Sequence, residues 1–470
     1  MLNKIDNQKS YELIKKNLKE INNLIWSFKQ LRQDTVEDLT FPINLSPKTI
    51  DADKLKMIRQ KTLDFNHILG ALASQIDKLI PFYEKYADEG TTLRLHLDAY
   101  KQVKKMTNRK KPLYLIGRHD FMFDEQIQSF QQIEYNLLSA AGGNTSKYLC
   151  QFIDEYYAKY RGIKLNRPQN SYHDLLKLAS HQFLNNSYNP DAYFMIIHNE
   201  VPLGDMNYFE KEIDLMVKLG IKVLNIKCSE LGQENYHVDE EGRFFYKKKE
   251  ISVIHYRAFK SFVIYHEIKT PFLVAAESSK AIIIPSLEMG LVNNKINHLL
   301  FCNEDLRKKY GVTLPEDHLL KVKDIITPTY MLEEDFDGDR QKMLDFVNKD
   351  RDSYLIKTLL EGGMGDVLVD QEMVDFIKEG EEKLLRQYLL VRKAKVNMTP
   401  SYAIRKDELH YFEKSIPELG IYFTSIFKEE NGEYRISWQH SDAYLVRTKP
   451  VGISKGGLST GYSTMDTLIL

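Results

Sequence analysis

The chain contains little cysteine, and it has no long apolar run. Only three of its 470 residues are cysteines, namely Cys150, Cys228 and Cys302, and they are widely spaced. This sparse, odd set argues against a disulfide scaffold and a zinc cluster, and it is typical of the reducing cytosol. The N-terminus lacks the apolar core of a signal peptide, and no run of about 18 apolar residues predicts a membrane span. We therefore expect a cytoplasmic protein with no membrane partner.

The sequence also lacks an excess of charge of either sign. It has 65 Lys and Arg against 66 Asp and Glu, which gives a formal net charge of −1. No global electrostatic field favours nucleic acid as a partner, although a local basic pocket is compatible with this balance. The motifs His-Glu-x-x-His, Cys-x-x-Cys and Gly-x-Ser-x-Gly are absent. A zinc hydrolase and a serine hydrolase are therefore not indicated.

Hydrophobic periodicity predicts a helical beginning followed by α/β structure. Residues 8–36 and 53–107 carry apolar side chains three and four apart, so the first hundred residues are predicted to be mainly helical. Further on, short apolar strands alternate with a helix at 207–218, which indicates a parallel α/β unit. These strands are expected at 193–198, 221–226 and 251–256, and a helix near 295–309 follows.

The remaining elements are predicted from short patterns on both sides of that unit. Strands are expected at 113–116 and 130–136, followed by a helix from Gly142-Gly143 to about residue 161. Towards the C-terminus we expect a strand at 354–357, a helix at about 370–385 and a strand at 388–393. Asn431-Gly432 separates two apolar runs, 421–427 and 434–438, which is a strong signal for a β-hairpin.

A carboxylate and an amide stand two residues apart in the predicted strand 130–136. Side chains two apart on a strand point to the same face, so Glu134 and Asn136 would lie together. Their oxygens form half of a site for a hard cation such as magnesium. Taken alone, the pair is more simply explained as the solvent-facing side of an edge strand.

A lysine and a glycine loop follow the strand at 354–357. Lys357 ends the strand, Glu361 follows four residues later, and Gly362, Gly363 and Gly365 come next. Such a loop can approach phosphate closely because glycine has no Cβ, and Glu361 is suited to hold the magnesium that bridges phosphates. The loop is neither a Walker A motif nor a dinucleotide-binding fingerprint. A tight strand–helix connection explains it about equally well.

Two further segments suit a nucleotide and a carboxylate. In the strand 388–393, the backbone can pair with an adenine edge while a lysine reaches phosphate, although a core strand ending in a charge is the simpler explanation. Arg447 is suited to grip a carboxylate, and the loop around Gly456-Gly457 can close over a small molecule. An exposed C-terminal loop is the alternative.

In this order, the segments resemble the eukaryotic-type glutathione synthetase family of ATP-grasp ligases. The resemblance extends with gaps from about Gly117 to Gly461 and is weak over the helical N-terminus. Its most specific segments are Gln132-Ile-Glu-x-Asn136 with Gly142-Gly143, Lys357-x-x-x-Glu-Gly-Gly, Glu418-Leu-Gly-Ile421, and Leu445-Val-Arg-Thr-Lys449 with Gly456-Gly457.

The resemblance implies an α/β fold of circularly permuted ATP-grasp type with an inserted parallel α/β substrate domain. We expect a helical region at 1–110, a core with the metal and substrate segment at 111–190, the inserted domain at 190–295, and the ATP-grasp core at 296–470, whose lid spans about 340–400. The implied reaction joins γ-glutamylcysteine to glycine with ATP through an acyl phosphate, giving glutathione, ADP and phosphate. The family also implies a homodimer.

The resemblance further implies residue roles, including two magnesium ions per active site. Metal ligands are Glu134, Asn136 and Glu361. ATP-binding residues are Glu134, Lys295, Lys357, Glu361, Gly362, Gly363, Val391, Arg392, Lys393, Glu418 and Lys449, with the backbone of Val391 and Arg392 meeting the adenine. Substrate-binding residues are Arg118, Ser139, Arg257, Arg447, Leu458 and Ser459. Arg118, Lys357 and Arg447 are expected to be catalytic.

Several positions depart from the family pattern, mostly on the substrate side. Leu368 falls where a tyrosine usually packs on the nucleotide, Lys260 replaces a tyrosine, and Lys455 replaces an aspartate. Leu458-Ser459 lies where the family sets the size of the last amino acid and matches neither the glycine nor the β-alanine pattern. Two alternatives therefore stay open: a homologous ligase that uses another amine, such as β-alanine or serine, and a non-catalytic ATP-binding paralogue.

Overall fold

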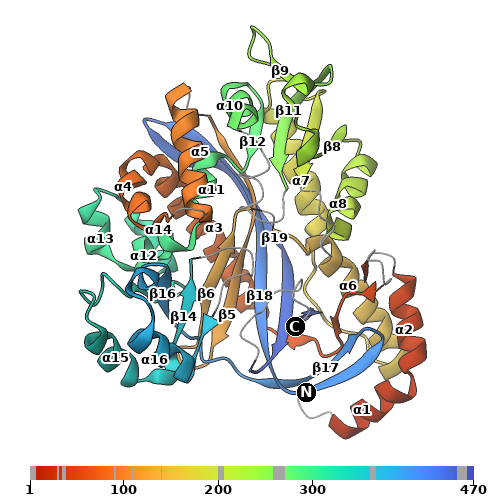
Figure 1. Cartoon of the computed structure of the whole chain (residues 1–470). Helices are drawn as coiled ribbons and strands as arrows, with labels where there is room; N and C mark the ends of the chain where they lie inside the picture. The colour runs from red at the N-terminus through yellow and green to blue at the C-terminus, as the bar shows by residue number, and fades with distance from the viewer. Residues whose placement is uncertain are drawn as a thin grey trace.

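The computed structural model in Figure 1 is a mixed α/β protein with several sheets. It describes residues 7–28, 31–33, 39–88, 91–106, 111–138, 140–198, 206–257, 270–359, 367–452 and 463–470. No helix within these ranges is long and apolar enough to cross a membrane.

A seven-stranded sheet forms the centre of the molecule, in the order β17-β3-β20-β19-β18-β5-β6. Its long hairpin of β18 and β19 turns at Asn431 and Gly432, whose φ angles of 56° and 88° confirm the turn predicted from that dipeptide. The bounds are β3 Ile43–Asn44, β5 Leu113–Asp124, β6 Ser129–Asn136, β17 Thr399–Arg405, β18 Glu408–Glu430, β19 Glu433–Pro450 and β20 Thr464–Asp466.

Helices cover both faces of this sheet. Alternate residues of a strand point to opposite faces, and in β5 Leu115 joins one buried cluster while Tyr114 and Ile116 join the other. Helices α3 and α5 contribute to the first cluster, and α6 and α7 to the second. The helices with their neighbours are α1 Asn7–Lys16, α2 Leu18–Ser27, α3 Ala52–Ser74, α4 Ile76–Tyr86, α5 Thr92–Met106, α6 Gly143–Tyr156 with the π-turn η3 Tyr157–Arg161, and α7 Tyr172–Asn186.

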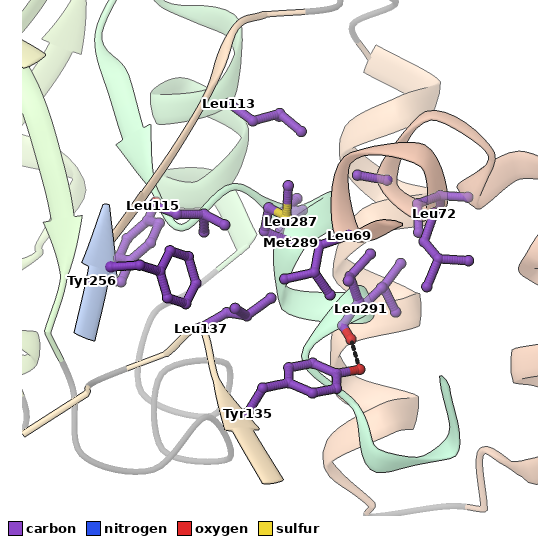
Figure 2. Packing of buried hydrophobic residues seen from close by; sticks show 14 of the residues in the cluster. Leu69, Leu72, Leu113, Leu115, Tyr135, Leu137, Tyr256, Leu287, Met289 and Leu291 are labelled. Carbon is purple, nitrogen blue, oxygen red and sulfur yellow. Dashed lines mark hydrogen bonds between the residues drawn. The ribbon is translucent and has the colours of Figure 1, made fainter. Parts of the chain in front are cut away.

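Figure 2 shows how the first cluster holds strand β6 against the helices. The Tyr135 side chain lies among Leu69, Leu137 and Leu291, and its hydroxyl donates a 2.8 Å hydrogen bond to the carbonyl of Val292. Tyr135 lies between Glu134 and Asn136, so its burial on one face directs those two polar side chains to the other face.

A second sheet contains the predicted parallel unit. Strands β8, β7, β11 and β12 pair in parallel, and β10 and β9 extend β11 in antiparallel fashion. The predicted strands and helix are confirmed. The bounds are β7 Tyr193–His198, α8 Met206–Lys218, β8 Val223–Lys227, η4 Cys228–Glu230, η5 Gln233–Asn235, β9 Tyr236–Val238, β10 Phe244–Tyr246, β11 Lys249–Tyr256, α10 Thr270–Ser278 and β12 Ile282–Ile284.

A four-stranded antiparallel sheet, β13-β16-β14-β15, packs one face against α15 and α16. The predicted strands at 354–357 and 388–393 are β14 and β16. The bounds are β13 Thr329–Met331, α15 Arg340–Asn348, η7 Arg351–Ser353, β14 Tyr354–Thr358, β15 Val367–Leu368, α16 Asp370–Glu379, α17 Glu382–Leu385 and β16 Tyr388–Arg392.

Three predicted helices are wrong in extent. The helix predicted at about 370–385 is divided into α16, which ends at Glu379, and α17, which begins at Glu382. The first N-terminal helical region ends at Ser27, and Arg32–Gln33 (β1) pairs with Leu39–Thr40 (β2) instead. The helix predicted near 295–309 is interrupted because Asn303 caps a new helix, its side chain accepting from the Leu306 backbone at 2.9 Å. Remaining bounds are α11 Leu287–Val292, η6 Lys295–Asn297, α12 His298–Cys302, α13 Glu304–Lys309, α14 Glu316–Val322, β4 Lys48–Thr49 and β21 Leu468–Ile469.

Candidate functional site

Four neighbouring strands of the central sheet place charged side chains on one face. Strand register sets Asp120 of β5 opposite both Glu134 of β6 and Gly420 of β18. It also sets Arg118 opposite Asn136, and Glu418 opposite Arg447 of β19. Directly opposed residues share a face. The structure therefore brings together six charged or polar residues, five of which were predicted from the resemblance: Arg118, Asp120, Glu134, Asn136, Glu418 and Arg447.

Asp120 is the centre of this group, although no sequence motif pointed to it. Its Oδ1 accepts from Arg118 Nε at 2.5 Å, and its Oδ2 accepts from Arg118 Nη2 at 2.8 Å. The same Oδ2 accepts from Arg447 Nη2 at 2.9 Å and from Asn136 Nδ2 at 3.0 Å. Arg447 Nη2 also forms an ion pair with Glu418. The only sequence signal was its position two residues after Arg118, on the same strand face.

The two arginines hold Asp120 in its ionised form. Burial alone would raise the pKa of Asp120, but the guanidinium groups of Arg118 and Arg447 outweigh it and hold the pKa below its usual value. The pKa of Arg447 is lowered, by burial first and also by Arg118, while Asp120 opposes the shift. A stable carboxylate between two arginines is the result.

Lys357 reaches this face from the end of strand β14. Its Nζ donates to the backbone carbonyl of Ile133 at 3.3 Å, next to Glu134. Burial lowers its pKa to about 8, with Lys295 and Lys449 lowering it further and Glu134 opposing. Two further lysines thus lie within electrostatic range of the half-buried Lys357, which is an arrangement that a polyphosphate would stabilise.

Lys393, directly after strand β16, extends this cation cluster. Burial, Arg447 and Lys393 together lower the pKa of Lys449, which places Lys393 within electrostatic range of the cluster. The backbone N–H groups of Arg392 and Lys393 donate to the carbonyls of Pro328 and Ser353, at 2.9 and 2.8 Å. An adenine beside Val391 and Arg392 would therefore pair with backbone groups other than these two donors.

Arg257, which was predicted to bind substrate, lies in a separate buried ion pair. Its Nη2 donates to Glu212 Oε2 at 3.0 Å and to the Ala140 carbonyl at 3.5 Å. The hydroxyl of Tyr172 donates to the other oxygen of Glu212 at 2.7 Å. Glu212 was not predicted from the sequence, because nothing in its helix indicated a partner on another strand.

Arg118 and Arg257 converge on one chain segment. Arg118 Nη1 donates to the carbonyl of Ala141 at 2.9 Å, and Arg257 donates to that of Ala140. The Tyr422 hydroxyl also donates to Ala141, at 2.5 Å. These contacts hold the residues that follow Ser139, whose own position lies outside the described residues.

Several predicted residues cannot be placed. Ser139, Glu361, Gly362, Gly363, Leu458 and Ser459 all lie outside the described residues. Leu368 is described, and it pairs with Ile356 and packs into the cluster beneath α15 and α16. Val367 pairs with Lys357 instead, so Val367 occupies the lysine side of this two-residue strand.

The described residues fit a magnesium site in the chemistry of their donors. The Asn136 amide nitrogen donates to Asp120, which leaves its Oδ1 as the outward oxygen. Within the described part of the chain, Glu134 forms no hydrogen bond or ion pair. Oxygen donors of this kind suit a hard cation. No group of three His, Cys, Asp or Glu side chains in the described ranges is placed to hold a metal, and the predicted third ligand, Glu361, lies outside them.

Comparisons with known proteins agree on one family. A family profile described as "Eukaryotic glutathione synthase, ATP binding domain" matches residues 13–470. The chain is 20% identical over 465 residues to the glutathione synthetase large chain of Schizosaccharomyces pombe, covering 91% of each protein. It is 22% identical over 379 residues to the chloroplastic glutathione synthetase of Arabidopsis thaliana, covering 77% of this chain and 66% of that protein.

Two further comparisons concern a second plant protein and a solved structure. The chain is 23% identical over 370 residues to the chloroplastic glutathione synthetase of Solanum lycopersicum, covering 76% of this chain and 64% of that protein. It thus spans slightly less than two thirds of both plant relatives. A glutathione synthetase-like effector from Globodera pallida, in its apo form, has a TM-score of 0.73 at 13% identity. That likeness covers 97% of this chain and 96% of the effector, and shows a shared fold.

Proposed function

This chain belongs to the eukaryotic glutathione synthase family, and we propose that it is an ATP-dependent ligase that joins γ-glutamylcysteine to glycine. The observation that carries the proposal is that two sets of side chains meet at one face of the central sheet. The cations around Lys357 suit a polyphosphate, and Arg447 beside Glu134 and Asn136 suits a carboxylate next to a metal. A binding protein for ATP alone would need only the first set.

In the first step, a carboxylate oxygen of γ-glutamylcysteine attacks the γ-phosphorus of ATP, and ADP leaves as the P–O bond breaks. Lys357, Lys295 and Lys449 stabilise the negative charge that spreads over the phosphoryl oxygens. Magnesium, held by Glu134, Asn136 and Glu361, would neutralise phosphate charge when bound, and we propose two ions per active site. The product of the step is an acyl phosphate.

In the second step, the neutral amine nitrogen of glycine attacks the acyl carbon, phosphate leaves with the bonding electron pair, and the proton that the amine loses passes to that phosphate. Arg447 holds a substrate carboxylate through guanidinium N–H groups that Asp120 and Glu418 do not use. No covalent bond to the protein is needed. We propose that the segment containing Gly362 and Gly363 closes over the site, since an acyl phosphate must be kept from water.

The test is Lys357→Ala, with Lys349→Ala as a matched control because Lys349 is an exposed lysine of the same region. ADP release is followed with ATP, magnesium and γ-glutamylcysteine, run separately with glycine, β-alanine, serine and no amine. We expect release to require glycine, and Lys357→Ala to lower kcat by about 100-fold or more because a preorganised charge is removed. Circular dichroism shows whether each variant is folded.

Each outcome of this assay decides between the candidates. A folded Lys357→Ala protein with normal turnover would refute the assignment of the ATP site. Turnover with β-alanine or serine in place of glycine would keep the reaction type and change the acceptor. Absence of turnover with every amine, in wild-type protein that still binds ATP, would refute ligase activity in favour of a non-catalytic ATP-binding protein. Light scattering of the same sample tests the proposed homodimer.

A further inference from the structure

We propose that Asp120 is a positioning residue that sets the geometry of the acyl-donor carboxylate and of the metal at once. The inference rests on the function proposed above and assigns a role to a residue that the resemblance left without one. It follows from one observation: a single buried carboxylate joins two predicted substrate-binding arginines of the central sheet, Arg118 and Arg447, to the predicted metal ligand Asn136.

Asp120 accepts hydrogen bonds from several side chains at once. Its side chain is buried and accepts four hydrogen bonds, three of them on Oδ2 from three different residues. Arg118, Arg447 and Asn136 together donate as many hydrogen bonds to Asp120 as a carboxylate usually accepts, and they converge on Oδ2. Any displacement of the carboxylate must therefore move at least one of these three side chains.

The contact with Asn136 decides which end of that amide meets a cation. Since Asn136 Nδ2 donates to Asp120, the amide oxygen is the end left for a cation. Without the carboxylate, the amide is free to rotate and to present its nitrogen, which cannot bind magnesium. Asp120 would thus act on the metal through Asn136 without touching it.

The contacts with the arginines keep two like charges together. Arg118 uses three of its five N–H groups on Asp120 and the Ala141 carbonyl. Arg447 reaches Asp120 and Glu418 through Nη2 alone, and its Nη1 and Nε have no partner within the described residues. The carboxylate therefore neutralises the repulsion between the guanidinium groups and leaves one edge of Arg447 for a substrate carboxylate.

Asp124 shows what a merely structural aspartate looks like on the same strand. It is also buried in β5, but its Oδ1 accepts from the backbone N–H groups of Gln126 and Ile127 and so holds only the turn after the strand. Asp124→Asn keeps an acceptor oxygen at that turn and is a matched control for Asp120→Asn.

The experiment compares wild type, Asp120→Asn and Asp124→Asn in three measurements. These are KM for γ-glutamylcysteine and for ATP, the magnesium concentration needed for half-maximal binding of a fluorescent ATP analogue, and the thermal unfolding midpoint. For Asp120→Asn we expect KM for γ-glutamylcysteine and the magnesium requirement to rise about 10- to 100-fold, as for lost hydrogen bonds to a buried charge. KM for ATP at saturating magnesium should stay within about twofold of wild type in Asp120→Asn. In Asp124→Asn, both KM values and the magnesium requirement should stay within about twofold of wild type.

Asp120→Glu is the second variant, because it retains the charge while shifting the carboxylate by one methylene. We expect it to fold and to show the same selective changes as Asp120→Asn. Equal loss of activity towards all substrates, in proportion to the folded fraction, would overturn the inference. Failure of both Asp120 variants to fold would also overturn it, since the role would then be structural.

The binding measurement keeps this inference separate from the proposed function. If wild type ligates no amine, the proposed function fails, but a magnesium requirement raised by Asp120→Asn still supports the link from Asp120 to the metal. An unchanged magnesium requirement together with an unchanged KM for γ-glutamylcysteine refutes the positioning role while leaving the ligase activity of wild type intact.

Discussion

One added methyl group, in Gly420→Ala, tests whether the close packing of the site matters for its chemistry. Gly420 lies opposite Asp120, and a Cβ atom there would be 2.6 Å from Arg118 Cδ and 2.8 Å from Asp120 Oδ1. Contacts this short force buried side chains to move. Overpacking of this kind costs about 1–3 kcal/mol of stability. A displacement of about 1 Å in groups that position substrate lowers the rate on the order of 100-fold.

Gly432→Ala is the control for the loss of stability. Gly432 lies at the turn of the same hairpin with a φ of +88°, and nothing lies within 4 Å of an added Cβ. Alanine there costs about 1–2 kcal/mol through backbone strain alone. Both variants should therefore unfold at lower temperature than wild type.

The assay is ADP release with ATP, magnesium, γ-glutamylcysteine and glycine, well below the unfolding temperature of both variants. We expect kcat/KM for γ-glutamylcysteine to fall about 100-fold in Gly420→Ala and to remain at the wild-type value in Gly432→Ala. Wild-type kcat/KM in folded Gly420→Ala would refute the reasoning, because the Arg118–Asp120 pair would then tolerate displacement without consequence.

Two further predictions concern titration and burial. Affinity for a fluorescent ATP analogue, titrated from pH 7 to pH 9.5, should weaken above the Lys357 pKa of about 8, since the lysine loses its proton there; the slope should approach about tenfold per pH unit, and Lys357→Arg should remove it. Asp466→Ala should lower the free energy of unfolding, measured by denaturant titration, by about 3–5 kcal/mol, because it leaves buried Lys48 without its carboxylate, 3.7 Å away. The double variant with Lys48→Met should recover most of that loss, and equal stability of the single variant and wild type would contradict the argument.

Much of the fold follows from local sequence signals. The hairpin at Asn431-Gly432 was predictable because a two-residue turn with positive φ angles has a narrow choice of residues. The buried strand 193–198 was predictable because it is an uninterrupted apolar run. The ends of the hairpin strands were not predictable from the sequence. Strand β18 begins at Glu408, among polar residues that pair with β17. Such pairing depends on a distant partner rather than on periodicity.

Local sequence signals likewise predicted some residues of the candidate site and not others. Glu134 and Asn136 could be predicted as a pair because two residues on one strand share a face. Their neighbours could not, because the register that brings Asp120 beside Arg447 joins strands 327 residues apart in sequence. Periodicity alone did not decide whether each candidate site segment has a functional or a structural role, and the family resemblance supplied the residue roles. It gave no role to Asp120 or Glu212, whose importance appears only in the packed structure.

The proposed ATP side and the proposed substrate side of the site differ in how their cations are paired. Burying Lys357 near Lys295 and Lys449 is unfavourable in the absence of an anion, as the lowered pKa of Lys357 shows. A multiply charged anion bound beside these lysines would offset that cost. Arg118 and Arg257, both expected to bind substrate, by contrast already have carboxylate partners within the protein. We therefore expect substitutions in the lysine cluster and substitutions at Arg257 to affect the binding of ATP and of γ-glutamylcysteine separately.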